Sequence, residues 1–238
     1  MVAFLLFLPG WARAQPADQR VVFGLLPCAG ANFDRPGGIR QLVWELVKRT
    51  SVEADADARP VDPADPQLFR TPFLLWSCPG PVATLSERQV AGLAAFLKNG
   101  GFLWADDPSA SGTGPFADSL RQQLQRVLPG QQWRNVPVEH VLYKTFFLIK
   151  RPLGRRAGAP RQALVIDERL VVLFTGGDLL GAMSRDLTGQ WDFNCQPAGE
   201  VQREESFRLA INIVMYSLCL DYKNDRVHLP FIMRRRRL

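Results

Sequence analysis

The chain has few of the residues that most often carry metal or nucleophilic chemistry. Its 238 residues include two histidines and four cysteines. No two cysteines are spaced Cys-x-x-Cys, which argues against a structural zinc site. The sequence also lacks an internal repeat and a low-complexity tract. With 47% apolar and 22% charged residues, it has the composition of a globular protein that buries one large core.

Long apolar runs are missing as well. A membrane-spanning helix needs roughly 20 consecutive apolar residues. The segment 4–8 is far shorter than this, and the segment 209–220 is interrupted by Asn212 and Ser217. We expect the second segment to be a buried helix.

The net charge of +6 is concentrated near the ends of the chain. Arg13 and the run Arg234–Arg237 supply five of the 29 basic residues, which leaves 24 basic against 23 acidic residues in the body of the protein. Nucleic acid is therefore not an expected partner, because its binding requires a basic surface stripe. The tail, residues 231–238, has two interpretations: attachment to an anionic membrane surface, or a frayed and solvated terminus.

The first 14 residues are typical of a secretion signal. A short apolar run leads to the small-x-small sequence Ala12-Arg13-Ala14, after which signal peptidase would cleave. No basic residue precedes Phe4, which departs from the usual pattern, and a buried strand or a membrane anchor is the alternative. We predict an exported, periplasmic protein with a signal at 1–14, a single α/β domain at 15–230 and a basic tail at 231–238.

Strand patterns and amphipathic helix patterns alternate along the first half of the chain. The predicted strands are residues 20–26, 72–76 and 102–105, with an extended piece at 58–61, and the predicted helices are residues 39–50, 86–99 and 116–128. This alternation is typical of a parallel sheet covered by helices. Further along, the sequence predicts a hairpin at the sheet edge, with strands at 163–167 and 170–175 joined at Glu168-Arg169, and a final helix at 205–220.

The order of five short motifs resembles that of a known family. The motifs are a Gly-rich loop after the first strand, Thr71–Leu74, Gly100–Asp107, His140–Tyr143 and Gly177-Asp178. Together they are similar to an exported bacterial family, domain of unknown function 4159, with a flavodoxin-like or class I glutamine amidotransferase-like fold. The resemblance implies a three-layer α/β fold with a mostly parallel sheet and an antiparallel hairpin extension. It also implies a cell-envelope setting, with the products of neighbouring MoxR-type ATPase or von Willebrand A-domain genes as partners, and no reaction.

Polar residues follow several of the predicted strands. In an open parallel sheet, ligands bind beyond the carboxyl ends of the strands. That rule selects Asn32, in the loop after the first strand, together with Asp106 and Asp107. One of the aspartates could supply a ligand for a divalent cation or a general base, aided by Asn32. An equally weighted interpretation is that both aspartates accept hydrogen bonds from backbone donors at a turn.

Three further residues are candidates for the same edge of the sheet. His140 has three interpretations: an acid or base, a metal ligand beside an aspartate, or a hydrogen-bonded residue that holds a loop. Tyr143 belongs to the same motif. Asp178 follows two glycines at the end of a strand and either faces the cleft or forms an ordinary glycine turn. Trp191 and Phe193 are either exposed aromatics at a binding surface or a hydrophobic plug.

The cysteines argue against amidotransferase catalysis. A cysteine nucleophile of this fold needs a sharp strand-to-helix turn whose next residue donates its backbone N–H. Cys78 is followed by Pro79, which has no N–H, and a long loop separates Cys28 from the next helix. Each of these cysteines lies two residues beyond an apolar strand, and neighbouring strands are about 4.8 Å apart. We therefore predict a Cys28–Cys78 disulfide in an oxidising compartment.

These observations favour a non-catalytic domain of the cell envelope that binds or scaffolds a partner or a small ligand. The predicted binding rim consists of Asn32, Asp106, Asp107 and His140. The alternative is a hydrolase that uses Asp106 or Asp107 with His140, with or without a bound divalent ion. That alternative requires the histidine to lie close to a carboxylate. No other cofactor is predicted.

Overall fold

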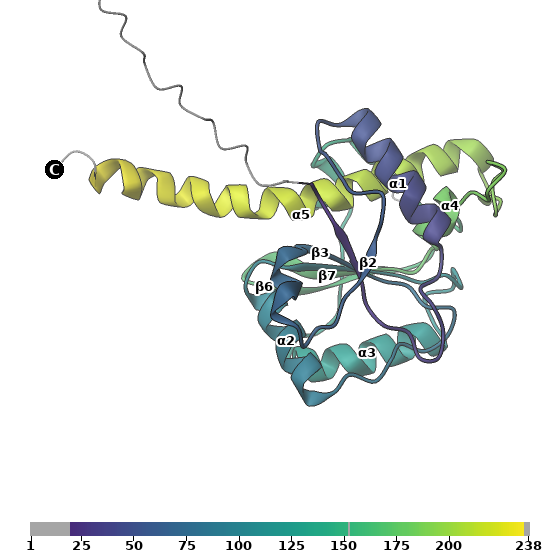
Figure 1. The fold of residues 1–238 in the computed structure, drawn as a ribbon. Helices are drawn as coiled ribbons and strands as arrows, with labels where there is room; N and C mark the ends of the chain where they lie inside the picture. Colours follow the sequence, from purple (N-terminus) through teal and green to yellow (C-terminus); the bar gives the residue numbers. More distant parts are fainter. Residues whose placement is uncertain (1–19, 152, 236–238) are drawn as a thin grey trace, which may run out of the picture.

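A central sheet with helices on both of its faces forms three layers in the computed structural model (Figure 1). The structure describes residues 20–151 and 153–235. The predicted signal at 1–14 lies outside them, as do residues 236–238 of the predicted tail. The elements are β1 Phe23–Leu25, α1 Pro36–Arg49, β2 Arg59–Pro60, η1 Pro66–Arg70, β3 Phe73–Trp76, α2 Glu87–Lys98, β4 Phe102–Asp106, α3 Pro115–Val127, β5 Arg134–Asn135, η2 Val141–Lys144, β6 Arg161–Ile166, β7 Arg169–Thr175, α4 Leu179–Met183 and α5 Gly199–Arg235.

The seven strands lie in the order β2-β1-β3-β4-β7-β6-β5. The first five are parallel to one another, and β6 and β5 continue the sheet in antiparallel fashion. Numbered along the chain, the parallel strands have the order 2-1-3-4-5, which is one of the two common orders of doubly wound sheets. The predicted mostly parallel sheet with an antiparallel hairpin extension is confirmed.

The hairpin turn lies one residue earlier than its predicted position. Asp167 and Glu168 have φ angles of 48° and 63°, the left-handed pair that a two-residue hairpin turn requires. Arg169 is the first residue of β7. A tight turn between two strands is thus confirmed, with a different pair of residues at its centre.

Alternate residues of each strand face opposite layers. Phe73 and Leu75 of β3 belong to a core cluster that also contains side chains of α1, α4 and α5. Leu74 and Trp76 of the same strand belong to a second cluster with α2 and α3. Because successive side chains of a strand point to opposite faces, each apolar strand supports both cores. The helices α1, α4 and α5 therefore cover one face, and α2 and α3 cover the other (Figure 1).

The helix starts depend on particular residues. Ser86 caps α2: its hydroxyl accepts from the N–H of Gln89, whose side chain accepts from the N–H of Ser86, which forms a capping box. Helix α1 begins at Pro36, three residues before the predicted start, because proline is favoured in the first turn. A Cβ on Gly38 would stand 2.3 Å from the carbonyl oxygen of Leu180, so glycine allows α1 to approach α4 closely.

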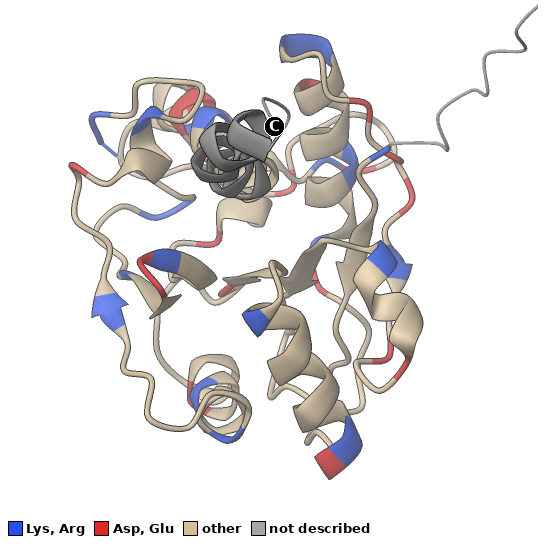
Figure 2. Cartoon of the chain, turned by 90° about the vertical axis from the view of Figure 1, so that its left-hand side faces the viewer, with Lys and Arg blue, Asp and Glu red and all other residues tan. Residues whose placement is uncertain are grey.

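Charged side chains are scattered over the described part of the fold. Lysine and arginine are interspersed with aspartate and glutamate on the elements of both faces (Figure 2). No helix in the described part of the chain is long and apolar enough to span a membrane.

The predicted disulfide between Cys28 and Cys78 is present, with a Cα–Cα distance of 5.6 Å. It joins the loops that follow β1 and β3, which are neighbouring strands of the sheet. After β1 the chain passes to α1 on one face, and after β3 it passes to α2 on the other. The disulfide thus lies at the point where a doubly wound sheet usually binds its ligand. Cys195 and Cys219 are free thiols.

Removing the disulfide is expected to lower the free energy of unfolding by about 4 kcal/mol, because a bridge across such a span strongly restricts the unfolded chain. The bridged residues are 50 positions apart. Urea unfolding of the Cys28→Ser/Cys78→Ser double variant measures the loss, and Cys219→Ser is the control, since it removes a sulfur that is not bridged. An unchanged unfolding midpoint in the double variant would contradict the expectation.

Candidate functional site

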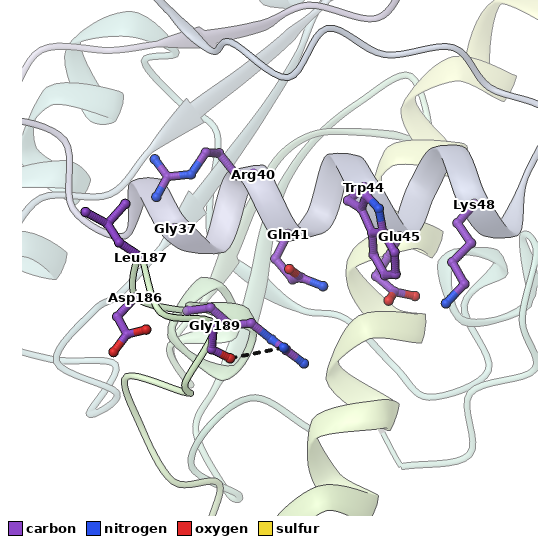
Figure 3. Close-up of a pocket in the computed structure, with 10 residues that line it drawn as sticks. Gly37, Arg40, Gln41, Trp44, Glu45, Lys48, Asp186, Leu187 and Gly189 are labelled. Carbon is purple, nitrogen blue, oxygen red and sulfur yellow. Dashed lines mark hydrogen bonds between the residues drawn. The ribbon is translucent and has the colours of Figure 1, made fainter.

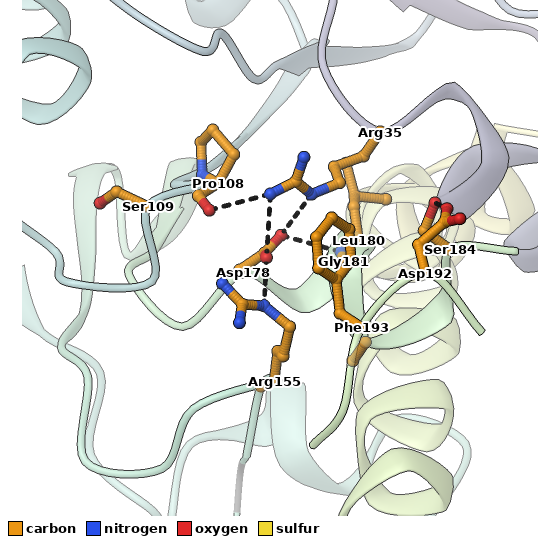
Figure 4. A network of polar contacts seen from close by, with 12 residues as sticks. Arg35, Pro108, Ser109, Arg155, Asp178, Leu180, Gly181, Ser184, Asp192 and Phe193 are labelled. Carbon is orange, nitrogen blue, oxygen red and sulfur yellow. Dashed lines mark hydrogen bonds and ion pairs between the residues drawn. The ribbon is translucent and has the colours of Figure 1, made fainter. Parts of the chain in front are cut away.

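A buried carboxylate lies at the centre of the polar contacts at the carboxyl edge of the sheet (Figure 4). Asp178 follows β7 and precedes α4, with a left-handed φ of 51° and no exposed surface. Its carboxylate accepts from the N–H of Gly181 and so caps the start of α4. Arg35 Nε lies 3.2 Å from Oδ1, and Arg155 Nε lies 2.5 Å from Oδ2. Asp178 therefore both caps a helix and balances two partly buried arginines.

Arg35 lies across the carboxyl edge of the sheet. It comes from the loop after β1, and its guanidinium also donates to Asp34 Oδ1 at 2.7 Å and to the carbonyl oxygen of Pro108 at 3.0 Å. These partners, with Asp178, belong to the loops that follow β1, β4 and β7. The ion pairs to Asp34 and Asp178 raise the pKa of Arg35 despite its burial. One side chain thus connects three loops.

The aromatic residues of the 184–198 segment are covered by arginines. The guanidinium carbons of Arg35 and Arg155 lie 4.3 and 5.1 Å from the centre of the Phe193 ring. Those of Arg185 and Arg203 lie 3.6 and 4.1 Å from the Trp191 ring. Both rings are partly buried. Of the two interpretations from the sequence, the plug fits better than the exposed binding surface, with arginines as its partners.

Asp106, at the end of β4, is also fully buried. Its carboxylate accepts from the Thr175 hydroxyl at 2.6 Å and from the N–H groups of Leu179 and Leu180 at 3.0 and 2.7 Å. Burial, followed by the nearby carboxylate of Asp178, raises the pKa of Asp106 to about 7. Asp106 therefore joins β4 and β7 to the first turn of α4.

Asp107 faces a different set of donors. It accepts from the N–H of Ser109 at 3.0 Å, from the Ser109 hydroxyl at 2.9 Å and from the N–H of Gly112 at 2.7 Å. Asp106 and Asp107 therefore both accept hydrogen bonds from backbone N–H groups. This agrees with the second interpretation from the sequence, in which the aspartates bind backbone donors at a turn. In the described part of the chain, no group of three or more His, Cys, Asp or Glu residues is placed to hold a metal ion.

His140 lies at the opposite edge of the sheet. Helix α5 runs from the carboxyl edge, where Arg203 donates to the carbonyl oxygen of Ala182 in α4, to the amino edge, where Tyr216 contacts Phe102 at the start of β4. These two helix positions are about 20 Å apart along the axis. The ring of His140 lies 5.7 Å from that of Tyr216, so the expected convergence of the histidine on the aspartates is wrong.

The local contacts of His140 explain its position. Its Nδ1 accepts from the N–H of Leu142 at 3.1 Å and so begins η2. In turn, the carbonyl oxygen of Leu142 accepts from the side chain of Asn212 in α5. Because η2 is held against α5 in this way, the histidine keeps a loop in place, which is one of its three interpretations from the sequence.

The two remaining candidate residues have different environments. Tyr143 is fully buried in the core beneath α5, beside Arg161, and burial raises the pKa of its hydroxyl. Asn32 is exposed in the loop after β1. The structure therefore brings four of the six predicted ligand-binding residues to the carboxyl edge, namely Asn32, Asp106, Asp107 and Asp178. The other two lie elsewhere: His140 at the amino edge of the sheet and Tyr143 in the core beneath α5.

Two hollows lie near these residues. One, of about 170 Å³, is lined by Asp34, Cys78 and the loop that contains Asp107. Ligand sites for small molecules usually have about 300–1,000 Å³, so this hollow is small for a cofactor. The other, of about 670 Å³, lies along the outer side of α1, from Gly37 in its first turn to Lys48 in its last (Figure 3).

A family model described as a domain of unknown function, DUF4159, matches residues 23–218. The chain belongs to this family. The match begins at β1 and extends into α5, so it includes every element of the sheet and the three buried aspartates, Asp106, Asp107 and Asp178. The resemblance inferred from the sequence motifs is confirmed at the level of the family. No curated protein matches the chain.

Sequence reasoning missed the two arginines of this DUF4159 domain. Arg35 and Asp178 are 143 positions apart in the sequence, and Arg155 and Asp178 are 23 apart. Neither arginine belongs to a recognisable motif. The one available signal was local: Arg35 precedes Pro36, and a proline that opens a helix places the preceding side chain at the strand-to-helix corner.

Replacing Asp178 by asparagine is expected to lower the free energy of unfolding by about 3 kcal/mol, because it leaves two arginines, whose side chains are only 14% and 15% exposed, without their anion. Urea unfolding at neutral pH measures the change. Asp186→Asn is the matched control, since that carboxylate is exposed and caps its own turn. If the two variants lost equal stability, the buried ion pairs would not be the cause.

Stability is expected to fall as the pH rises from about 4 to 7, because the folded state keeps the Asp106 proton in a range where the unfolded state has released it. The pKa of this group is about 7 when folded and 3.8 at its ordinary value. The stability that this proton contributes is complete below the ordinary pKa of 3.8 and is lost as the pH rises through the folded pKa of about 7. Unfolding free energies of Asp106→Asn should vary less with pH, whereas Asp186→Asn should follow the unmodified protein. Identical pH slopes for all three proteins would contradict this.

Proposed function

We propose that this DUF4159 domain is a non-catalytic binding domain of the cell envelope, which presents a preformed outer surface to a partner. The observation that carries the proposal is the filled carboxyl edge of the sheet. There Arg35 and Arg155 lie against Asp178, and Asp106 and Asp107 accept three hydrogen bonds each from nearby groups. The side chains best suited to chemistry are thus committed to holding the fold.

The usual ligand crevice of a doubly wound sheet is closed in this chain. That crevice forms where the connections from neighbouring strands pass to opposite faces. Here the Cys28–Cys78 disulfide joins the two loops at that point, and the Arg35 side chain reaches across the adjoining strand ends. The hollow that remains has about 170 Å³, which favours recognition at another surface.

The described residues do not assemble an acid–base or thiol centre. The histidine that a hydrolase would need lies at the amino edge of the sheet, next to Tyr216. Cys28 and Cys78 are bonded to each other. Burial raises the pKa of the Cys195 thiol, which disfavours the reactive thiolate. The geometry therefore supports binding better than the alternative hydrolase.

Export is the second part of the proposal. The disulfide between Cys28 and Cys78 is of a kind that persists in oxidising compartments, and residues 1–14 match the pattern of a secretion signal. The family resemblance implies the same cell-envelope setting. Envelope proteins encoded nearby, such as MoxR-type ATPases or von Willebrand A-domain proteins, are the proposed partners, and the arginine tail is a proposed contact with the membrane surface.

Enzyme assays test the non-catalytic proposal. The purified protein is expected to hydrolyse neither glutamine nor model esters and phosphoesters, with or without added divalent ions, because His140 lies far from the aspartates and Cys28 is bonded to Cys78. Circular dichroism first checks that the His140→Ala and Asp106→Asn variants are folded. Turnover by the unmodified protein that disappears in either folded variant would overturn the proposal in favour of a hydrolase.

A further inference from the structure

A groove of about 670 Å³ runs along the exposed side of α1. One wall is the helix itself, and the other is the loop that carries Asp186, Leu187 and Gly189 (Figure 3). Arg40 and Leu187 lie at one end of the groove and Lys48 at the other. The outer side of α1 therefore has a larger concave surface than the hollow of about 170 Å³ at the carboxyl edge.

The basic side chains of the groove are not balanced by its acidic ones. Arg40 and Lys48 are exposed, and neither forms an ion pair with another described residue. Of the two acidic lining residues, Glu45 is buried against Arg49, and the exposed Asp186 accepts hydrogen bonds within its own turn but keeps its negative charge. Arg40, Lys48 and Arg185 outnumber it among the lining residues. The charge available to a partner in the groove is positive.

Apolar surface lies between these charges. The side chain of Trp44 is 55% exposed, and that of Leu187 is 98% exposed. The ammonium group of Lys48 stands 4.4 Å from the Trp44 ring centre. Partly exposed tryptophan beside cationic groups is typical of the centre of a protein interface.

The second wall of the groove is held in one conformation. The guanidinium of Arg185 lies 3.6 Å from the Trp191 ring and donates to the carbonyl oxygen of Gly189. The hydroxyl of Ser184 donates to the carboxylate of Asp192. A preformed wall lowers the entropy lost when a partner binds.

The geometry points to an acidic, extended segment of a partner protein as the occupant of this groove, with carboxylates near Arg40, Lys48 and Arg185 and an apolar side chain against Trp44 and Leu187. The assignment rests on the proposed binding function and adds the chemistry of the partner. From Gly37 to Lys48 the helix rises roughly 16 Å, which about five extended residues span. The concave shape fits a peptide better than a flat membrane surface.

Fluorescence anisotropy with labelled peptides tests this assignment. Three peptides of about ten residues, longer than the groove by a few residues at each end, are built from Glu, Leu and Pro, from Glu, Ser and Pro, or from Lys, Leu and Pro. Proline keeps each of them extended. The Glu/Leu peptide is expected to bind most tightly and to weaken as the salt rises from about 0.05 to 0.5 M, because salt screens exposed charges. The Lys/Leu peptide is expected not to bind.

Charge reversal locates the contact. The Arg40→Glu/Lys48→Glu variant should bind the Glu/Leu peptide at least about tenfold more weakly, since two attractive charges become repulsive. The matched control is Arg88→Glu/Lys98→Glu, which changes the net charge equally at exposed positions of α2 on the opposite face. The control should bind within about twofold of the unmodified protein. Trp44→Ala should weaken the Glu/Leu peptide more than the Glu/Ser peptide.

Each other outcome overturns the groove assignment. Equal losses in both charge-reversal variants would show that net charge, not the groove, attracts the peptide, and no binding of any peptide would exclude an acidic segment. Binding of anionic vesicles in place of the peptide would assign the groove to a membrane surface. A dimer of the unmodified protein that is lost in Arg40→Glu/Lys48→Glu, as measured by sedimentation, would assign it to a second copy of the chain. None of these results produces turnover, so the assignment can fail while the proposed non-catalytic function stands.

Discussion

The structure depends on one buried carboxylate and the two arginines that neutralise it. Asp178 has no exposed surface, and a carboxylate removed from water is strongly destabilising unless cations and hydrogen-bond donors replace the lost solvation. Arg35 and Arg155 supply those cations, and the first turn of α4 supplies an N–H donor. Since each partner comes from a different segment, satisfying this one charge fixes how the segments meet.

That constraint also explains where the molecule is open and where it is closed. Arg35 must reach across the strand ends to meet Asp178, and in doing so it fills space that a ligand would otherwise occupy. Its position at the start of α1, together with the close approach of Gly38 to Leu180, holds α1 against α4. The exposed side of α1 is then left to form the outer groove. Closure of the crevice and presentation of the groove thus have a common origin.

Much of the fold could be predicted because the signals were local. Strand and helix periods assign each apolar side chain to a face, Ser86 marks a helix start through a hydrogen bond three residues away, and Cys28 and Cys78 follow strands that pair directly. The candidate site was predicted less well. His140 and the aspartates belong to the same set of family motifs, but this does not place them on the same edge of the sheet. His140 contacts Tyr216 of α5, which lies at the amino edge.

The sequence by itself therefore determined the α/β class, the mostly parallel sheet with its hairpin, and the disulfide, because each follows from short-range patterns. Only the tertiary structure decided which charges are buried together. Arg35 and Asp178 meet across 143 positions of sequence, and no local period encodes such a partner. The same holds for the groove, whose two walls come from α1 and from the loop after α4. Both features exist only once the helices have packed, since packing alone determines which side chains leave water and which remain exposed.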